Sequence, residues 1–128
     1  MDRRTTLAYM SPQEEADIKR NIPWEDLDPK ILETVRIANS IDGIATVQSC
    51  AGHIKYDGEE LFTENANLAF LFNRGYKIES LLETAQHVGI SDVSIRFFGE
   101  GFCMCLSVEP ERREKLRDFL EAVNNENV

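Results

Sequence analysis

The segment Ser49 to His53, of sequence SCAGH, places a hydroxyl, a thiol and an imidazole within five residues. It follows the alternating apolar run Ile44 to Gln48, which is typical of a strand. Loops held by a rigid scaffold are where binding and chemistry concentrate. Gly52 would let a ligand approach the backbone closely. The pattern therefore predicts a binding or catalytic site at the end of this strand.

Cys50 is the candidate nucleophile of this segment. Backbone N–H groups in a glycine-containing turn, or a protonated imidazole, lower the pKa of a thiol. His53 is placed to orient or deprotonate it, so the catalytic candidates are Cys50 and His53. The alternative, which the sequence favours, is that Cys50 contacts a ligand or structures the loop, because free cysteines commonly behave as small hydrophobic groups.

A zinc site built from Cys50, His53, Cys103 and Cys105 has suitable residue types but unsuitable spacing. Cys103 and Cys105 are a strand repeat, which we expect to separate their sulfur atoms. A further strand is expected between their strand and that of Cys50, which places the two strand axes about 10 Å apart. A zinc–sulfur bond spans only ~2.3 Å. The sequence therefore predicts no metal site.

Alternation along the predicted strands assigns side chains to two faces of a sheet. The positions expected to face the core on the last two strands are Val93, Ile95, Phe97, Phe102, Met104, Leu106 and Val108. The positions expected to face outward are Ser94, Arg96, Phe98, Cys103, Cys105, Ser107 and Glu109, joined by Thr46, Gln48 and Cys50 from the first strand. One face is thus predicted to be polar, small and thiol-bearing, open to a ligand, to another subunit or to water.

The predicted ligand site lies between this face and the Ser49 to His53 segment. Its ligand-binding residues are Thr46, Gln48, Ser49, Ala51, Gly52 and Arg96. Arg96 is the expected anion anchor, because a guanidinium binds a carboxylate or phosphate through two hydrogen bonds. The alternative for Arg96 is an ion pair with Glu100 or Glu109.

Helices and strands alternate in an order that indicates the fold class. Cap-plus-proline signals at Ser11-Pro12 and Asp28-Pro29 each begin a helix. Helical spacing of apolar residues predicts further helices at 77–88 and 111–123. Strands are expected at 44–49, 67–72, 93–98 and 102–108, with a long polar connection at 51–66. This order predicts an α+β fold, a four-stranded antiparallel sheet with helices on one face, as a circular permutation of the ferredoxin-like pattern.

Length and composition restrict the class of protein. The 128 residues fit a single domain, divided into a short helix and connector (1–27), a body (28–123) and a frayed tail (124–128). A net charge of -9 argues against nucleic-acid binding, and the mixed-sign run 111–118 is typical of a solvated helix face. No apolar run reaches the ~18 residues of a membrane span. Three cysteines predict reduced thiols in a cytoplasmic protein.

Two family resemblances involve the same segment. Residues 38–40, Thr46 and the run from Ser49 to Ile54 resemble the helix-to-strand region of the third wybutosine-synthesis protein family, which carries a Ser-Cys-Ser-Gly-Arg-Ile run. The chain also resembles small uncharacterised prokaryotic and phage proteins with Ser-Cys-x-Gly-His, which it matches in size, in the helix start at 26–29 and in His53.

The first resemblance implies S-adenosylmethionine-dependent methylation of a tricyclic tRNA base, with Ser49, Cys50, Gly52 and Ile54 lining the site. The second implies no established activity.

Three functions follow from these patterns. The function that we predict is a small-molecule or nucleotide-binding domain with its site at the Ser49 to His53 loop. One alternative is a methyltransferase that uses S-adenosylmethionine on a modified tRNA base. The other is a non-catalytic homo-oligomeric interaction protein that uses the open sheet face and Phe98. The sequence leaves open whether the protein is an enzyme.

Overall fold

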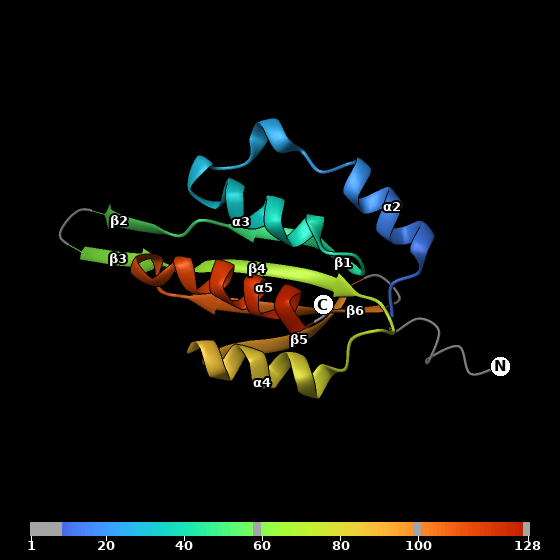
Figure 1. Ribbon diagram of the computed structural model, residues 1–128. Helices are drawn as coiled ribbons and strands as arrows, with labels where there is room; N and C mark the ends of the chain where they lie inside the picture. Colours follow the sequence, from blue (N-terminus) through green and yellow to red (C-terminus); the bar gives the residue numbers. More distant parts are fainter. Residues whose placement is uncertain (1–8, 58–59, 99–100, 127–128) are drawn as a thin grey trace.

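The computed structural model describes residues 9–57, 60–98 and 101–126 (Figure 1), with the backbone alone at 53–57, 60–63, 98 and 101. The sheet strands are β1 (Ile44–Cys50), β4 (Ala66–Phe72), β5 (Asp92–Phe98) and β6 (Gly101–Val108), and a separate pair is β2 (His53–Asp57) and β3 (Glu60–Glu64). The helices are α2 (Pro12–Arg20), α3 (Pro29–Ser40), α4 (Ile78–Val88) and α5 (Glu114–Glu126), with short 3-10 turns η1 (Trp24–Asp26) and η2 (Pro110–Arg112). None of the helices in these ranges is long and apolar enough to cross a membrane.

The predicted α+β fold is confirmed by the sheet. Its four strands are antiparallel in the order β1-β4-β6-β5. This order follows from two hairpins: β1 returns as β4, and β5 returns as β6, which lies against β4. The order is that of the predicted permutation, and it places β1 and β5 at the two edges.

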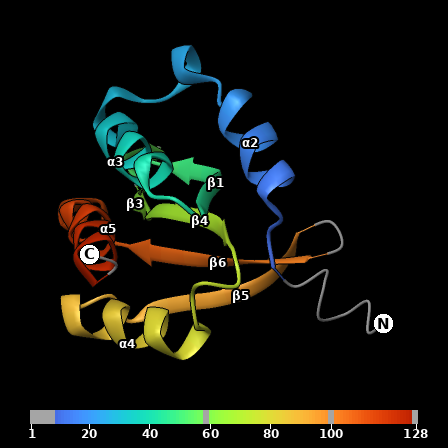
Figure 2. The ribbon, with the colours of Figure 1, turned by 45° about the vertical axis from the view of Figure 1, so that its right-hand side comes forward.

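Three helices, α3, α4 and α5, cover one face of the sheet (Figure 2). The layer between them is filled by large apolar side chains, of which Phe70 on β4, Met104 on β6 and Phe119 on α5 are fully buried. The rings of Phe70 and Phe119 lie 5.9 Å apart between centroids. Burying such side chains supplies the main stabilisation of the fold.

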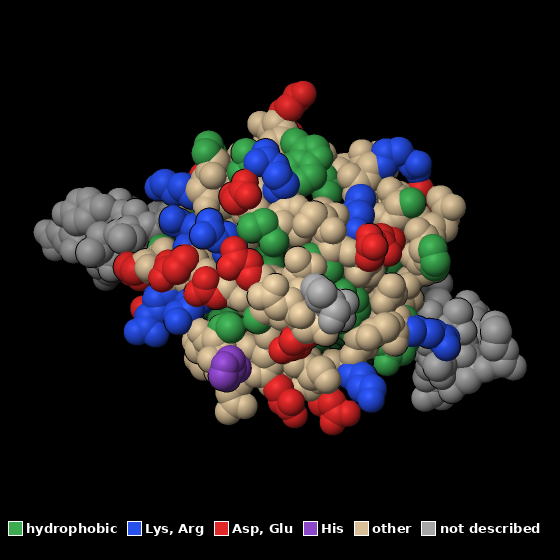
Figure 3. Space-filling model, viewed as in Figure 1, with side chains coloured by type: hydrophobic (Ala, Val, Ile, Leu, Met, Phe, Trp, Pro, Cys, Tyr) green, Lys and Arg blue, Asp and Glu red, His purple; other side chains and the backbone are tan. Residues whose placement is uncertain are grey.

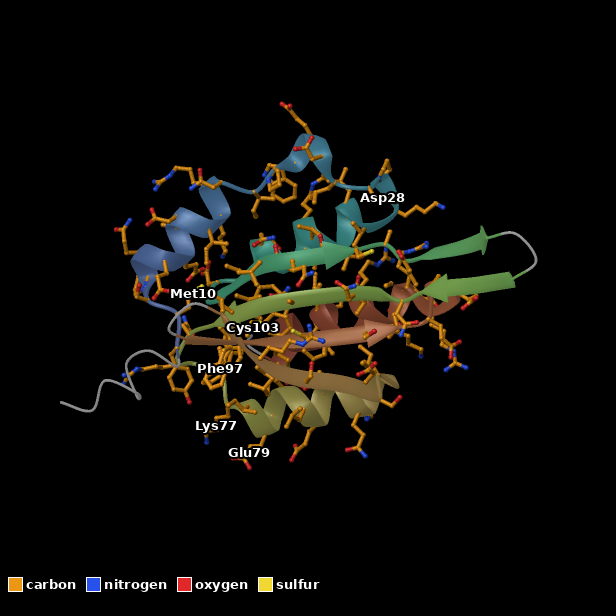
Figure 4. All side chains as sticks on the ribbon, turned by 180° about the vertical axis from the view of Figure 1, so that it is seen from behind. Met10, Asp28, Lys77, Glu79, Phe97 and Cys103 are labelled. Atoms are coloured by element: carbon orange, nitrogen blue, oxygen red, sulfur yellow. The ribbon has the colours of Figure 1, made fainter. Side chains whose placement is uncertain are left out.

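The first helix, α2, lies on the opposite face and departs from the expectation that helices occupy one face. Ile18 of α2 packs against a small apolar cluster that contains Met10, Ala45, Leu71 and Cys103. Met10 and Cys103 lie close together at this end of the sheet (Figure 4). This helix therefore covers one end of the second face and leaves the other end open.

Polar contacts attach α2 to the turn before β1. Gly43 N–H donates to Oε2 of Glu15 at 2.8 Å. Lys19 Nζ donates to the same oxygen at 2.6 Å and to the carbonyl of Ile41 at 3.0 Å. Burial acts to raise the pKa of Glu15, but the hydrogen bonds from Lys19 and Gly43 and the charge of Lys19 outweigh it and hold that pKa below its ordinary value.

Residues 51–66, predicted as a long connection, are mostly paired strands. The β2–β3 pair continues the β1–β4 pair in the same register, with Cys50 opposite Asn67 and His53 opposite Glu64. The prediction was wrong because it overlooked a hairpin signal. Alternating residues flank Asp57-Gly58, a dipeptide typical of tight hairpin turns.

A β-bulge in β1 changes which side chains share a face. Thr46 pairs with Phe70, which faces the helices, whereas Gln48 pairs with Ala69, which faces away from them. The register shifts between Thr46 and Gln48 because β1 carries one more residue there than β4 does. The prediction that Thr46 shares a face with Gln48 and Cys50 is therefore wrong.

The last helix, α5, runs to Glu126, three residues past its predicted end at Val123. The hydroxyl of Thr84 on α4 lies 3.2 Å from a carboxylate oxygen of Glu126. This contact between helices supports the final turn of α5 in a segment that we had expected to fray.

Candidate functional site

The Ser49 to His53 segment is a short break in a paired ribbon rather than a loop. β1 ends at Cys50 and β2 begins at His53, and Gly52 between them has φ of +79°. A Cβ atom at this glycine would lie 2.7 Å from the nitrogen of Ala66 and 2.8 Å from the carbonyl oxygen of Glu64. The close approach is to the neighbouring strand, which accounts for the glycine without a ligand.

Backbone polar groups of the same break are used within the fold. Ala51 is buried, and its carbonyl accepts a hydrogen bond from Nε of Arg113 at 2.7 Å. The Gly52 N–H donates to Sγ of Cys50 at 3.5 Å. Arg113, just before α5, therefore holds the ribbon at the point where its pairing is interrupted.

Three other predicted site residues lie in different surroundings. Thr46 is buried and forms two hydrogen bonds with Asn39 of α3. Nδ2 of Asn39 donates to the Thr46 hydroxyl at 2.8 Å, and the backbone N–H of Thr46 donates to Oδ1 of Asn39 at 3.1 Å. Ser49 lines an apolar groove along β1, between α2 and α3. His53 begins β2, but its side chain lies outside the described residues, so its pairing with Cys50 stays a prediction.

Gln48 and Arg96 meet the prediction of a shared site in one respect: they line the same hollow on the open face of the sheet, the face toward the viewer in Figure 4. The hollow has a volume of about 150 Å³. We call it the open-face hollow, and its lining is Gln48, Asn67, Leu68, Ala69, Asp92, Ser94, Arg96, Cys105, Leu106 and Ser107. All four strands of the sheet contribute to it.

Two rows of side chains across the strands build this hollow. The pairing register gives the first row as Gln48, Ala69, Cys105 and Ser94. It gives the second row as Cys50, Asn67, Ser107 and Asp92, of which the last three line the hollow. Directly opposed side chains have Cβ atoms about 5 Å apart. Ala69, in the middle of the first row, has a small side chain and therefore leaves a space above the sheet. Longer side chains at the sheet edges surround this space.

Arg96 supplies positive charge to the hollow. It is exposed on the edge strand β5, and its side chain forms no ion pair and donates no hydrogen bond to another described residue. Of its two predicted partners, Glu109 is not paired with it, and Glu100 lies outside the described residues.

The sulfur atoms of Cys103 and Cys105 lie 3.7 Å apart. The expectation that the strand repeat separates them is therefore wrong, because both side chains turn toward one another on the open face. Burial, with the hydrogen bond and charge of Cys105, raises the pKa of the Cys103 thiol to about 11, against the opposing charge of Arg96. In the described residues, no group of three or more His, Cys, Asp or Glu side chains is arranged to hold a metal ion.

The other face of the sheet lies beneath α3, α4 and α5, so these helices form its outer surface. Lys and Arg side chains are intermixed there with Asp and Glu side chains (Figure 3). Arg117 pairs with Glu121 along α5 at 3.4 Å. This agrees with the mixed-sign surface that the sequence predicts for the start of this helix.

Sequence reasoning missed Asn67 and Asp92 as lining residues, and it placed Ser94, Cys105 and Ser107 on the polar face without joining them to a site. Strand alternation carries the signal for the latter three. The convergence of all five depends on the strand order and on the bulge in β1, which a residue pattern does not specify.

No known protein family matches the chain, and no curated protein matches it. The two resemblances at the Ser49 to His53 segment therefore stay predictions.

Proposed function

We propose that the protein binds a small anionic metabolite, one that carries a phosphate or carboxylate group, in the open-face hollow. The observation that carries this proposal is the Arg96 guanidinium, which has no ion-pair partner among the described residues and borders a hollow lined by neutral hydrogen-bonding side chains and by the carboxylate of Asp92. An exposed guanidinium presents a planar fork of donors that matches a carboxylate or phosphate.

The lining residues define which ligand chemistry fits. Arg96 would hold the anionic group through two parallel, charge-assisted hydrogen bonds. Ser94, two residues from Arg96 on the same face of β5, would bind another of its oxygen atoms, and Gln48, at the opposite edge of the sheet, would contact a different part of the ligand. Asp92 lies four residues along β5 from Arg96, about 13 Å at the rise of a strand. Its carboxylate would accept a hydrogen bond from a hydroxyl or amine at the other end of the ligand, as in a sugar phosphate.

The size of the hollow favours a small ligand. Enclosed small-molecule pockets usually measure about 300–1,000 Å³, and this hollow measures about 150 Å³. The ligand would therefore lie on the sheet with one side in water. Methyl transfer from S-adenosylmethionine, a larger molecule, stays an alternative proposal, and that compound is included as a comparator in the test.

Calorimetric titration of Arg96→Gln and Arg112→Gln tests the proposal. Both substitutions remove one positive charge, but Arg112 is exposed in η2, away from the hollow. With ribose 5-phosphate as the probe, we expect Arg96→Gln to weaken binding at least tenfold, or about 1.4 kcal/mol, and Arg112→Gln to have little effect. Equal weakening in both variants would indicate non-specific attraction and contradict the proposal, as would the absence of binding to the wild type. Saturable binding of S-adenosylmethionine alone would favour the methyltransferase alternative.

A second candidate function, self-association, is favoured by the exposed edge strand β5. Phe97 is 91% exposed and Ile95 is 43% exposed. Both lie on the same face as Val93, as predicted. The prediction that the Phe97 side chain points into the core is wrong, because the helices do not cover this end of β5. The predicted anchor Phe98 has its side chain outside the described residues.

Antiparallel pairing of two β5 strands about Ser94 would be self-complementary. It would place Asp92 of one copy opposite Arg96 of the other twice, once on each side of the twofold axis. Opposite charges in such cross-strand pairs are stabilising. Light scattering tests this arrangement: Arg96→Asp should dissociate a dimer, and the double variant Asp92→Arg/Arg96→Asp should restore it. A monomeric wild type, or a dimer that Arg96→Asp leaves intact, would contradict it.

A further inference from the structure

The pair Cys103 and Cys105 is a feature that anion binding does not use. Their sulfur atoms lie 3.7 Å apart on one strand. Cys105 is half-buried and borders the open-face hollow, and Cys103 is buried beside it under the end covered by α2. Both thiols are free. The pair is therefore a preformed dithiol that can be reached from the hollow through Cys105.

We propose that Cys103 and Cys105 form a binding site for a thiophilic divalent cation of the zinc class. Two metal–sulfur bonds of about 2.3 Å that meet at the tetrahedral angle place their sulfur atoms about 3.8 Å apart. The observed separation of 3.7 Å matches this value. The dithiol therefore has the spacing to bind such an ion with little rearrangement of the strand.

The charges also balance at this site. On binding, each thiol loses its proton to solvent, so one divalent cation and two thiolates form a neutral unit with release of two protons. A neutral unit is less costly to hold in a half-buried place than a single charge. Arg96 lies directly opposite Cys103 in the pairing register, and its positive charge partly opposes the burial that raises the pKa of this thiol.

The remaining coordination positions would be open to the hollow. The two sulfurs supply half of a tetrahedral set, and no third protein ligand of the usual kind is arranged beside them in the described residues. Water or a small ligand would complete the set, because the protein supplies one ligand fewer than the three of a usual catalytic zinc site. We therefore expect exchangeable binding rather than a permanent structural metal, and this binding does not depend on the proposed anion.

Cys50 provides a matched control within the chain. It is half-buried like Cys105 and faces the same side of the sheet, in the second row. β4 lies between its strand and β6, so the strand axes are about 10 Å apart. Cys50 is therefore too far away to join the dithiol in holding one ion.

The experiment titrates the reduced protein with Cd²⁺, a spectroscopically visible ion of the same class, in buffer free of phosphate and carboxylates. We expect one equivalent to bind, with a cadmium–thiolate absorption band and release of two protons. Cys105→Ser and Cys103→Ser should each weaken binding more than about 100-fold, since loss of even a second-shell partner costs 10–100-fold. Cys50→Ser should bind as the wild type does, and Zn²⁺ should displace Cd²⁺.

A second measurement keeps the test valid if Cys103→Ser fails to fold. In the wild type, Cd²⁺ should slow the alkylation of Cys105 by iodoacetamide and leave that of Cys50 unchanged. The proposal would be overturned if no saturable thiolate band formed, if Cys105→Ser bound Cd²⁺ as tightly as the wild type, or if Cd²⁺ protected Cys50 as well as Cys105.

Discussion

The two faces of the sheet are built from alternate residues of the same strands but have different contents. On β4, Leu68 and Phe70 are fully buried beneath the helices, and their neighbours Asn67 and Ala69 border the open-face hollow. The covered face excludes water, whereas the open face presents polar groups and thiols to it. Stability and the proposed ligand binding thus depend on alternate positions. Substitutions on one face should change one property and largely spare the other.

The covered face should show the largest effect on stability. Phe70→Ala removes a fully buried ring that packs against Phe119. We expect a loss of about 3–5 kcal/mol in the free energy of unfolding, measured by urea denaturation. Ser94→Ala, on the open face, is the control and should change this free energy by less than about 0.5 kcal/mol. Similar losses in the two variants would contradict the division between the faces.

The break between β1 and β2 should be the next most sensitive place. Gly52→Ala forces a side chain into a positive φ and against the backbone of Ala66. We expect it to lower the free energy of unfolding by about 1–3 kcal/mol. Gly75→Ala is the control, because a Cβ there meets only the Asn73 side chain, at 3.1 Å. If Gly52→Ala were no more destabilising than Gly75→Ala, the account of the break as a structural feature would be wrong.

The attachment of α2 to the second face should depend on pH. Because the pKa of Glu15 is lowered in the folded state, its ionised form contributes stability above the unfolded pKa, and this contribution is lost as pH falls through the folded pKa. Glu15→Gln should therefore cost about 1–2 kcal/mol near neutral pH and much less in acid. Denaturation at both pH values checks this, with the exposed Glu33→Gln as control. A cost that did not change with pH would show that ionisation of Glu15 is not its cause.

The smallest effect on stability is expected at Arg96. Because Arg96 is exposed and has no ion pair among the described residues, Arg96→Gln should change the free energy of unfolding by less than about 0.5 kcal/mol. The same variant should weaken anion binding. Thermal unfolding of the variant without ligand checks the first expectation, and a large loss of stability would show that Arg96 has a structural role.

Alternation and capping signals predicted much of the fold. The apolar alternation of Met104 and Leu106 identified the covered face, and the cap at Ser11 and the proline at Pro29 marked helix starts. These signals are local, so each can be recognised from a few neighbouring residues. Strand order followed from the sequence of elements, because hairpins pair neighbouring strands.

The candidate site was less predictable because its geometry depends on contacts between distant residues. The bond from Arg113 to Ala51 joins residues 62 positions apart and gives the SCAGH segment a structural use. The bulge in β1 places Thr46 on the covered face, although alternation had grouped it with Gln48 on the open face. The distance between the sulfurs of Cys103 and Cys105 depends on side-chain rotamers, which strand periodicity does not fix. Reactive residue types thus indicated a region but not the surface that they form.

The central claim is that the open face, rather than the segment from Ser49 to His53, holds the ligand. The most direct test is a map of backbone amide shifts by NMR as ribose 5-phosphate is added to the wild type. The account predicts saturable shifts at Gln48, Ser94 and Arg96, with little change at the buried Ala51. Shifts centred on Ala51 and Gly52 and absent from β5 would contradict it and return the site to the segment first indicated by the sequence.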